Sequence, residues 1–272
     1  MKDFFGALGI LFLFTSCSPQ NGYFATPAQL TATSFVALGW QDRPFWEGAA
    51  VETLASNQIE NSVQALVSRP GVRWKTIVLA FRPTTGQITA WKKLNPHTRW
   101  FWLAPPGTTT TVPGASRLSW STTQGWSLLG ESAASWAKNR NLASALALVG
   151  DSSSEADREA LLASWSKILP HAPLTFYTVL PQQTAPEALL GHIPPQTPAI
   201  FLLFGPSSAD VIPRLPASTA RFGIFVPRVS APDWSVSVTP DGSAAYQIVQ
   251  QALSAPPHDL VNLPWKSVKL HS

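Results

Sequence analysis

Cysteine is almost absent from this sequence, because Cys17 is the only one among 272 residues. A single cysteine cannot build an intramolecular disulfide framework, and it cannot supply the set of thiolates that a structural zinc site needs. The sequence therefore excludes a disulfide-stabilised fold and a cysteine zinc site.

Charged side chains are also scarce, at 12% of the chain, and no run of lysine and arginine occurs. The formal net charge of +4 reflects a shortage of acids, so it does not indicate a nucleic-acid-binding surface. We expect no nucleic-acid partner. A thinly spread positive charge is still compatible with a surface that rests on anionic lipid.

Catalytic motifs are missing as well. The sequence contains no phosphate-binding loop of the GxxxxGKS type, no GxGxxG after a strand, no HExxH and no GxSxG. The five histidines are scattered near prolines, and although the fifteen acids leave a glycosidase-like carboxylate pair open, no spacing proposes one. We therefore expect a protein that is not an enzyme, with no catalytic residues, no metal site and no cofactor.

The first residues have the pattern of an export signal. The apolar run FFGALGILFLFTS (residues 4–16) follows Lys2 and is too short to span a bilayer. Cys17 follows directly, and this arrangement resembles the lipobox of bacterial lipoproteins, whose cysteine becomes the acylated first residue. The resemblance implies a signal peptide at residues 1–16, lipidation of Cys17, and a cell-envelope protein held in a membrane. The alternative is an ordinary cysteine behind a cleaved signal or in a short anchor.

The remaining roughly 255 residues are enough for one large or two medium domains. Residues 17–33 lack hydrophobic periodicity and are expected to form a tether between lipid and fold. Residues 105–116, PPGTTTTVPGAS, are expected to be a surface loop or a crossing between domains.

From residue 34 onward, apolar strand-like runs alternate with helical segments. The expected strands are 34–40, 75–81, 99–104, 143–149, 174–180, 199–204 and 221–226. The expected helices are 44–56, 85–94, 122–138, 154–169, 185–190 and 207–215. Continuous apolar runs of this length are typical of buried parallel strands, so the order predicts a doubly wound α/β fold.

Three fragments resemble the type I periplasmic binding proteins and the sugar-binding cores of related repressors. They are TSFVALGWQDRPFWEGAAVETLA near the start, ALALVGDSSSEADREALLASW in the middle, and WSVSVTPDGSAAYQIVQQALSAPPHDLVNLPWKSVKL at the end. The resemblance implies two Rossmann-like lobes joined by a hinge: an N-terminal lobe at 34–121 with the returning segment 235–272, and a C-terminal lobe at 122–234. The interval before Lys75 is short for a further strand and helix, which would leave the first lobe with an abbreviated sheet.

The resemblance also implies a small molecule bound beyond the carboxyl ends of the strands, between the two lobes. The residues that follow the expected strands are the candidates: Asp42, Arg43, Phe45, Trp46, Arg82, Asp151, Arg158 and Arg228, with Asp241 as a further position. Each has a structural alternative, because the aromatic rings can pack a helix onto the sheet and the charged groups can pair or lie in solvent.

Polar clamps typical of sugar-binding relatives are missing at two such positions, where this chain has Pro105–Pro106 and Phe204–Pro206. A free sugar is therefore disfavoured, and a nucleoside or another flat, aromatic compound is favoured; a pocket that has lost its ligand is the third reading. The predicted function is a lipid-anchored solute-binding protein that serves an ABC-type inner-membrane permease. The alternative is an envelope lipoprotein of the same fold that binds proteins. The choice of membrane and the oligomeric state stay open.

Overall fold

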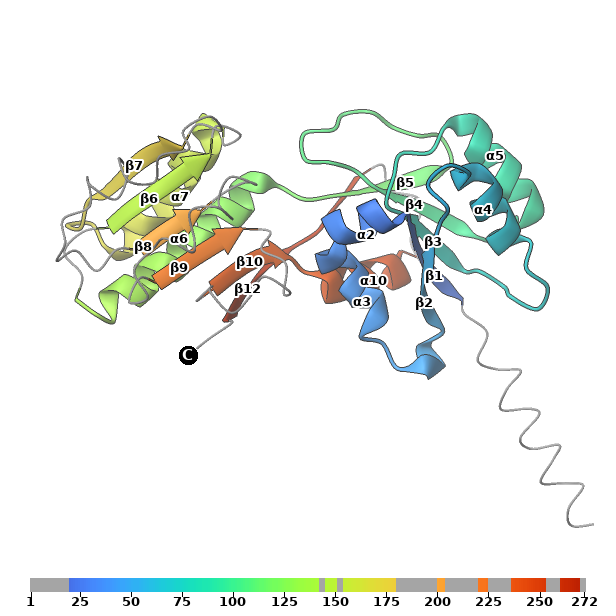
Figure 1. The fold of residues 1–272 in the computed structure, drawn as a ribbon, viewed down its shortest axis with the longest axis horizontal. Coiled ribbons are helices and arrows are strands. Elements are labelled where there is room, and N and C mark those ends of the chain that lie inside the picture. The colour runs from blue at the N-terminus through green and yellow to red at the C-terminus, as the bar shows by residue number, and fades with distance from the viewer. Residues whose placement is uncertain are drawn as a thin grey trace, which may run out of the picture. The chain divides into compact units, whose positions relative to one another are not determined.

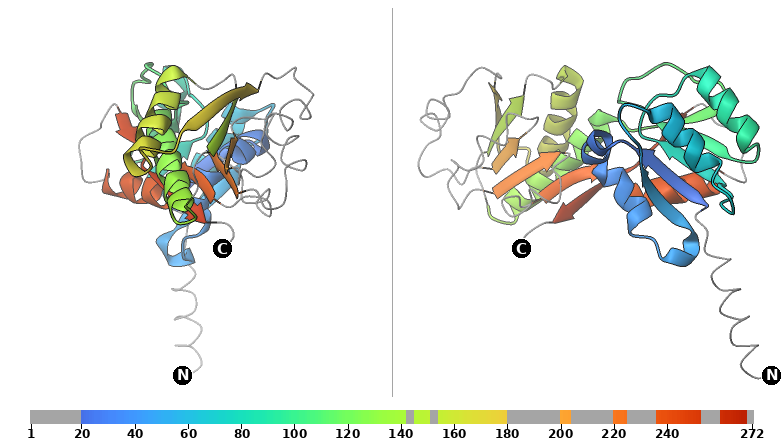
Figure 2. Two further views of the ribbon diagram at one scale, coloured as in Figure 1. Left: turned by 90° about the vertical axis from the view of Figure 1, so that its left-hand side faces the viewer. Right: turned by 45° about the vertical axis from the view of Figure 1, so that its right-hand side comes forward.

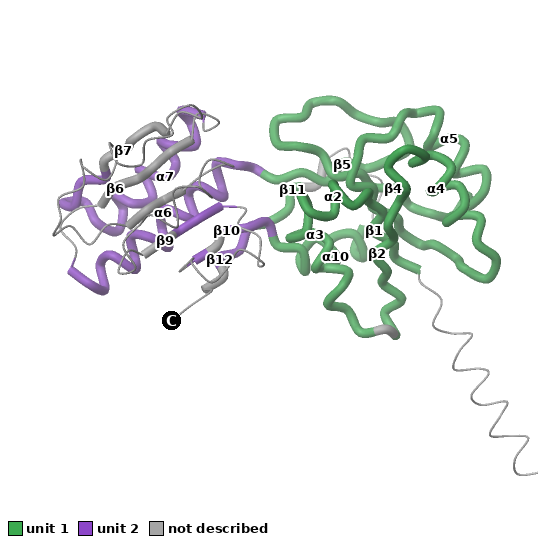
Figure 3. Tube along the Cα trace, viewed as in Figure 1, with its two compact units in different colours: residues 1–120, 241–264 green, residues 121–240, 265–272 purple. Residues whose placement is uncertain are grey.

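A computed structural model describes residues 20–141, 145–150, 154–179, 200–203, 220–224, 236–252 and 260–269. The chain forms two compact units (Figures 1 and 3). Unit 1 comprises the residues up to Trp120 together with Asp241–Pro264, and unit 2 comprises Ser121–Pro240 together with the residues from Trp265 onward. The chain therefore passes from one unit to the other three times. Parallel sheets and packed helices confirm the predicted α/β class.

Unit 1 is built on a six-stranded sheet in which every neighbouring pair is parallel. In spatial order the strands are β11 (Leu260–Asn262), β5 (Ala115–Ser119), β4 (Arg99–Leu103), β3 (Thr76–Leu79), β1 (Asn21–Ala25) and β2 (Ala49–Thr53). One face is covered by α2 (Pro27–Ala32), α3 (Ser34–Gln41) and α10 (Gly242–Gln251), and the other by α4 (Ile59–Val67) and α5 (Thr85–Leu94) (Figure 2).

The predicted tether at residues 17–33 is wrong, because it contains β1. This strand lies between β2 and β3, and all of its residues are buried. Alternate side chains enter opposite cores, since Tyr23 faces α3 and α10 whereas Phe24 faces α4 and α5. Helix α2 follows at once, with Thr26 and Gln29 forming a capping box.

The segment at 34–40 is helix α3, where the sequence predicted a strand. It buries Val36, Ala37 and Trp40 against the sheet, so the apolar residues of this segment form the buried face of a helix. The expected helix at 44–56 is replaced by the short 3₁₀ helix η1 (Phe45–Glu47) and strand β2. Strand β2 and helix α4 both precede β3 in the chain, so the predicted abbreviation of the first sheet is wrong.

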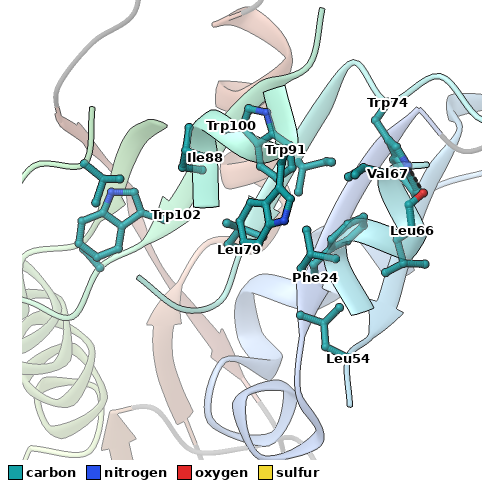
Figure 4. Close-up of a cluster of buried hydrophobic side chains, with 14 residues drawn as sticks. Phe24, Leu54, Leu66, Val67, Trp74, Leu79, Ile88, Trp91, Trp100 and Trp102 are labelled. Carbon is teal, nitrogen blue, oxygen red and sulfur yellow. Dashed lines mark hydrogen bonds between the residues drawn. The ribbon is translucent and has the colours of Figure 1, made fainter. Parts of the chain in front are cut away.

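Tryptophan fills the core of unit 1. Figure 4 shows the cluster beneath α4 and α5, where Trp74, Trp91, Trp100 and Trp102 are all at most 2% exposed. The indoles of Trp91 and Trp100 are stacked with ring centroids 5.4 Å apart, and Trp74 Nε1 donates a hydrogen bond to the Leu66 carbonyl at 3.1 Å. Aromatic burial of this extent supplies much of the hydrophobic stabilisation of the unit.

A buried asparagine joins several elements at the start of β1. The Asn21 side-chain amide donates to the Glu47 carbonyl at 3.1 Å and to the Tyr246 hydroxyl at 3.3 Å, and its oxygen accepts from the Thr76 hydroxyl at 2.9 Å. Strands β1 and β3, η1 and α10 thereby share one satisfied polar network.

Unit 2 contains helices α6 (Thr122–Lys138) and α7 (Glu155–Ile168), which pack on one another. Its strands are β6 (Ala145–Gly150), which pairs with β7 (Leu174–Val179), and a sheet in the order β12 (Trp265–Lys269), β10 (Val236–Pro240), β9 (Ala220–Ile224) and β8 (Ile200–Leu203). Strand β12 is antiparallel to β10, and the other described pairs are parallel.

The returning segment divides differently from the prediction. Residues 235–272 were assigned to the first lobe, but β10 and β12 lie in unit 2 and only Asp241–Pro264 returns to unit 1. The stretch at 105–116 is not a crossing, since it lies within unit 1, where it connects β4 to β5 and includes the first two residues of β5. The crossing follows at Trp120. The expected helices at 185–190 and 207–215 lie outside the described residues.

The contact between α3 and α10 yields a prediction. A Cβ on Gly39 would overlap the Gly242 carbonyl, so Gly39→Ala should lower the free energy of unfolding by ~1–3 kcal/mol through overpacking. Gly86→Ala in α5 is the control, because a Cβ there meets nothing closer than 3.9 Å and should stabilise by ~0.4–1 kcal/mol. Urea unfolding of both variants measures the difference, and equal stability would contradict the packing described.

A second prediction concerns alkaline pH. Burial raises the pKa of Tyr23 well above its ordinary value, while its hydrogen bond to Thr33 partly opposes the rise. Above about pH 10 the unfolded chain loses the phenolic proton first, so it binds fewer protons than the native state and the free energy of unfolding falls with pH. Tyr23→Phe should flatten this fall, although losing the hydrogen bond costs ~1 kcal/mol at neutral pH. Urea unfolding at a series of pH values tests this, and an unchanged slope would argue against it.

Candidate functional site

The strands of unit 1 all run the same way, so its sheet has two chemically different edges. The carboxyl edge consists of the residues just after the strands: Thr26, Leu54–Gln58, Ala80–Thr84, Ala104–Pro106 and Trp120. The amino edge consists of the loops just before them: 42–48, 68–75, 95–98 and 111–114. Ligands of open parallel sheets lie at the carboxyl edge.

Four of the predicted ligand-binding residues lie at the wrong edge for this role. Asp42, Arg43, Phe45 and Trp46 were expected to follow a strand, but they follow helix α3 and precede β2. They therefore belong to the amino edge, where the Gly48 carbonyl accepts hydrogen bonds from the backbone of residues 20 and 21. Asp42 is exposed at the end of α3.

Arg43 has a structural role. Its Nε donates to the Gly39 carbonyl at 3.1 Å, and its Nη2 donates to the Ser243 carbonyl at 3.3 Å. The guanidinium carbon also lies 4.7 Å from the centre of the Tyr246 ring, within cation–π range. Arg43 thus fastens α3 to α10.

Trp46 differs from the buried tryptophans of the core, because 70% of its surface is exposed. Phe45 stands beside it in η1, but its side chain lies outside the described part of the structure. The two aromatic residues therefore do not form the predicted ligand platform at the carboxyl edge.

Arg82 lies at the carboxyl edge of unit 1. It follows β3 and is exposed, between the partly buried Phe81 and the buried Pro83. Thr84 then starts α5 with a capping box that uses Gln87. The guanidinium of an exposed arginine can bind a carboxylate, a phosphate or a pair of hydroxyls.

The sequence reasoning missed an aromatic pair near this edge. Trp120 directly follows β5, and its ring meets that of Phe35 from α3 edge-on, with centroids 5.6 Å apart. Both side chains are partly exposed. The sequence does not predict this pair, because it does not predict β5. The strand ASRLS is polar and has no continuous apolar run, so residues 105–116 resemble a linker.

In unit 2, Arg158 lies in the first turn of α7, after β6, and is partly exposed. Its neighbour Asp157 is buried and accepts hydrogen bonds from the Ser154 backbone and the Thr123 hydroxyl, both at 3.3 Å. Asp157 thereby joins the N-termini of α6 and α7, whose positive dipole ends favour a carboxylate. The predicted residues Asp151 and Arg228 lie outside the described residues.

Among the predicted residues that the structure describes, Arg82 thus follows strand β3 in unit 1, and Arg158 follows strand β6 in unit 2. Asp241, the further position, caps α10 in unit 1 through hydrogen bonds to the backbone of residues 243 and 244. Within the described ranges, no three histidine, cysteine or acidic side chains gather as metal ligands would.

A cavity of about 500 Å³ lies at the amino edge of unit 1. Its basic lining comes from Lys92, His97 and Arg99, where α5 ends and β4 begins. The loop before β5 and the first two residues of β5 also line it, at residues 111–116. This cavity is at the edge opposite Arg82, so it is separate from the carboxyl-edge residues.

No family model and no curated relative matches the sequence. Solved structures do match the fold. An ABC transporter solute-binding protein from Conexibacter woesei DSM 14684 is 14% identical with a TM-score of 0.63, over 92% of this chain and 88% of its own. A solute-binding protein of the same transporter class from Aeropyrum pernix K1 is 14% identical with a TM-score of 0.55, over 92% and 77%.

A periplasmic ribose ABC transporter protein from Conexibacter woesei DSM 14684 is 12% identical with a TM-score of 0.54, over 94% of this chain and 93% of its own. Identities this low establish the fold alone. Both units are included in matches of this extent, and the predicted likeness is confirmed at that level: the chain has the fold of type I periplasmic binding proteins.

Proposed function

We propose that the chain is a lipid-anchored solute-binding protein of the cell envelope, which captures a small molecule. The observation that carries this proposal is the fold match over 92% of the chain to a protein described as an ABC transporter solute-binding protein. The carboxyl-edge positions of Arg82 and Arg158 add support, because ligands of such sheets bind there.

A nucleoside or another flat compound is the ligand class we favour. The abundance of tryptophan does not support this choice, because most of the described indoles are in the cores. Support comes from the carboxyl edge itself, where Phe81, Phe35 and Trp120 offer partly exposed rings and Arg82 offers hydrogen-bond donors. Pro105 and Pro106 at the same edge have no side-chain donors for sugar hydroxyls.

The anchor and the location form the second part of the proposal. Cys17 lies outside the described residues, so its acylation rests on the lipobox-like sequence before it. In the part of the chain that the structure describes, no helix has the length and apolar character needed to cross a membrane. An acylated Cys17 would hold the protein at the periplasmic face of a membrane, where an ABC-type permease is the partner that the fold suggests.

A protein-binding envelope lipoprotein is the second candidate function. The observation in its favour is Trp46, because tryptophan is enriched at the energetic centres of protein interfaces and this side chain is 70% exposed. Under this alternative, the carboxyl edges would hold no small molecule.

The test is a thermal-shift screen of a form that begins at Ser18 and retains β1. We expect nucleosides or flat aromatic compounds to raise the midpoint, since a ligand at 100 times its dissociation constant stabilises by ~2.7 kcal/mol. Arg82→Ala should raise the dissociation constant of the ligand at least tenfold, because a charged hydrogen-bond partner is lost.

Arg73→Ala is the matched control, because Arg73 and Arg82 are both exposed and flank the two ends of β3. Its ligand response should equal that of the unmodified protein. If no nucleoside, sugar, amino acid or peptide shifts the midpoint, the solute-binding proposal fails and the protein-binding alternative gains.

A further inference from the structure

We propose that the amino edge of unit 1 rests on the membrane surface that holds Cys17, with Trp46 in the headgroup region and basic loops against anionic lipid. This inference depends on the lipid anchor of the proposed function and adds the face that meets the bilayer. Three features of the described structure support it: the length of the tether, the distribution of charge, and the exposure of Trp46.

The tether is far shorter than the sequence suggested. Strand β1 begins at Asn21, and Gln20 is already fixed by the sheet: its N–H donates to the Gly48 carbonyl at 2.7 Å, and its carbonyl accepts from the Lys75 N–H at 2.6 Å. Only Ser18 and Pro19 separate Cys17 from Gln20, so the Cα atoms of Cys17 and Gln20 are three residue steps apart, a span of at most roughly 10 Å when fully extended. Acyl chains on Cys17 would thus enter the bilayer close to the amino edge.

The position of Gln20 also identifies which loops meet the lipid. It hydrogen-bonds both to the 42–48 loop, which contains Trp46, and to the 68–75 loop, which contains Lys75. These two loops flank the point from which the tether leaves. Any bilayer within reach of Cys17 therefore lies beside both of them.

Charge is unevenly distributed between the two edges of the sheet. The basic residues at or beside the amino edge are Arg43, Arg73, Lys75, Lys92, Lys93 and Arg99, in addition to Arg69, which pairs with Glu52 at 3.2 Å. The 42–48 loop adds the acids Asp42 and Glu47, whereas the carboxyl edge has Arg82 as its basic residue. The excess of positive charge at the amino edge complements anionic headgroups, which attract lysine and arginine near the surface.

The lining of the cavity at this edge also suits an anionic lipid headgroup. Lys92, His97 and Arg99 line it, and its 500 Å³ opens between the ends of α5 and the start of β4 and β5. Donors of this kind bind phosphate oxygens. Trp46 supplies the apolar contribution, because tryptophan prefers the membrane–water interface, where its ring is buried and its N–H stays hydrated.

The proposed arrangement has a consequence for the solute site. Strands of about five residues extend roughly 16 Å, so the carboxyl edge with Arg82 would face away from the lipid. The site would then be open to the periplasm. A protein partner at Trp46 is the competing occupant, but it would explain neither the short tether nor the basic loops.

The experiment uses Cys17 as an artificial anchor, which makes it independent of acylation in cells. A form that begins at Cys17 is coupled through this sole cysteine to a maleimide phospholipid, in vesicles of equal parts phosphatidylcholine and phosphatidylglycerol. Part of the lipid is brominated on the acyl carbons nearest the headgroup. We expect bromine to quench the fluorescence of Trp46, measured as the difference between the unmodified protein and Trp46→Phe.

Matched variants decide between the two edges. Thr85→Trp in the Trp46→Phe background places an indole at an exposed position of the carboxyl edge and should show no quenching. Arg73→Gln with Lys75→Gln should abolish the quenching of Trp46. Thr89→Glu with Ala90→Glu on the exposed side of α5 changes the net charge equally and should leave it intact.

Absence of quenching at Trp46, or equal quenching at Trp46 and at a tryptophan in place of Thr85, would overturn the proposal. An unquenched Trp46 would instead favour a protein partner. Acylation in cells is measured separately, from the mass of the N-terminal peptide. Its absence would remove the natural anchor from the proposed function, while the vesicle experiment would still report whether this face binds lipid.

Discussion

The structure of unit 1 depends on the burial of strand β1 between β2 and β3. Its backbone pairs on both sides, and its side chains enter both cores, so its removal would cost hydrogen bonds to two neighbouring strands and buried surface on both faces of the sheet. At its first residue, Asn21 ties the strand to η1 and α10 through a fully satisfied polar network. Partners in such a network are costly to lose, because a buried unpaired group pays its full desolvation penalty.

The position of β1 also decides where every later loop lies. Because β1 and α2–α3 form the first strand–helix unit, the 42–48 loop falls at the amino edge and Arg82 at the carboxyl edge. An assignment that starts one element later moves the same side chains to the opposite edge of the sheet. Whether the 42–48 loop lies at the carboxyl edge or at the amino edge of the sheet therefore depends on the five buried residues of β1.

The sequence predicted the elements whose signals are local. The expected helices at 85–94 and 122–138 coincide with α5 and α6, and the expected helix at 154–169 contains α7, which has a capping box at Ser154. Residues 34–40 failed, because a short apolar run fits a buried strand and a buried helix equally well. β1 was missed because the strand NGYFA is brief and stands next to proline and glycine, which are typical of loops.

The discontinuity of unit 1 constrains the order in which the protein can fold. The segment Asp241–Pro264 supplies α10 and β11, so Trp40 on α3 lacks its contact with α10 and β5 lacks its outer neighbour until this segment has been synthesised. Until then this apolar surface is exposed to water and to other chains, which is the condition under which nascent proteins aggregate. Chaperones that shield such surfaces would have their longest opportunity on this unit.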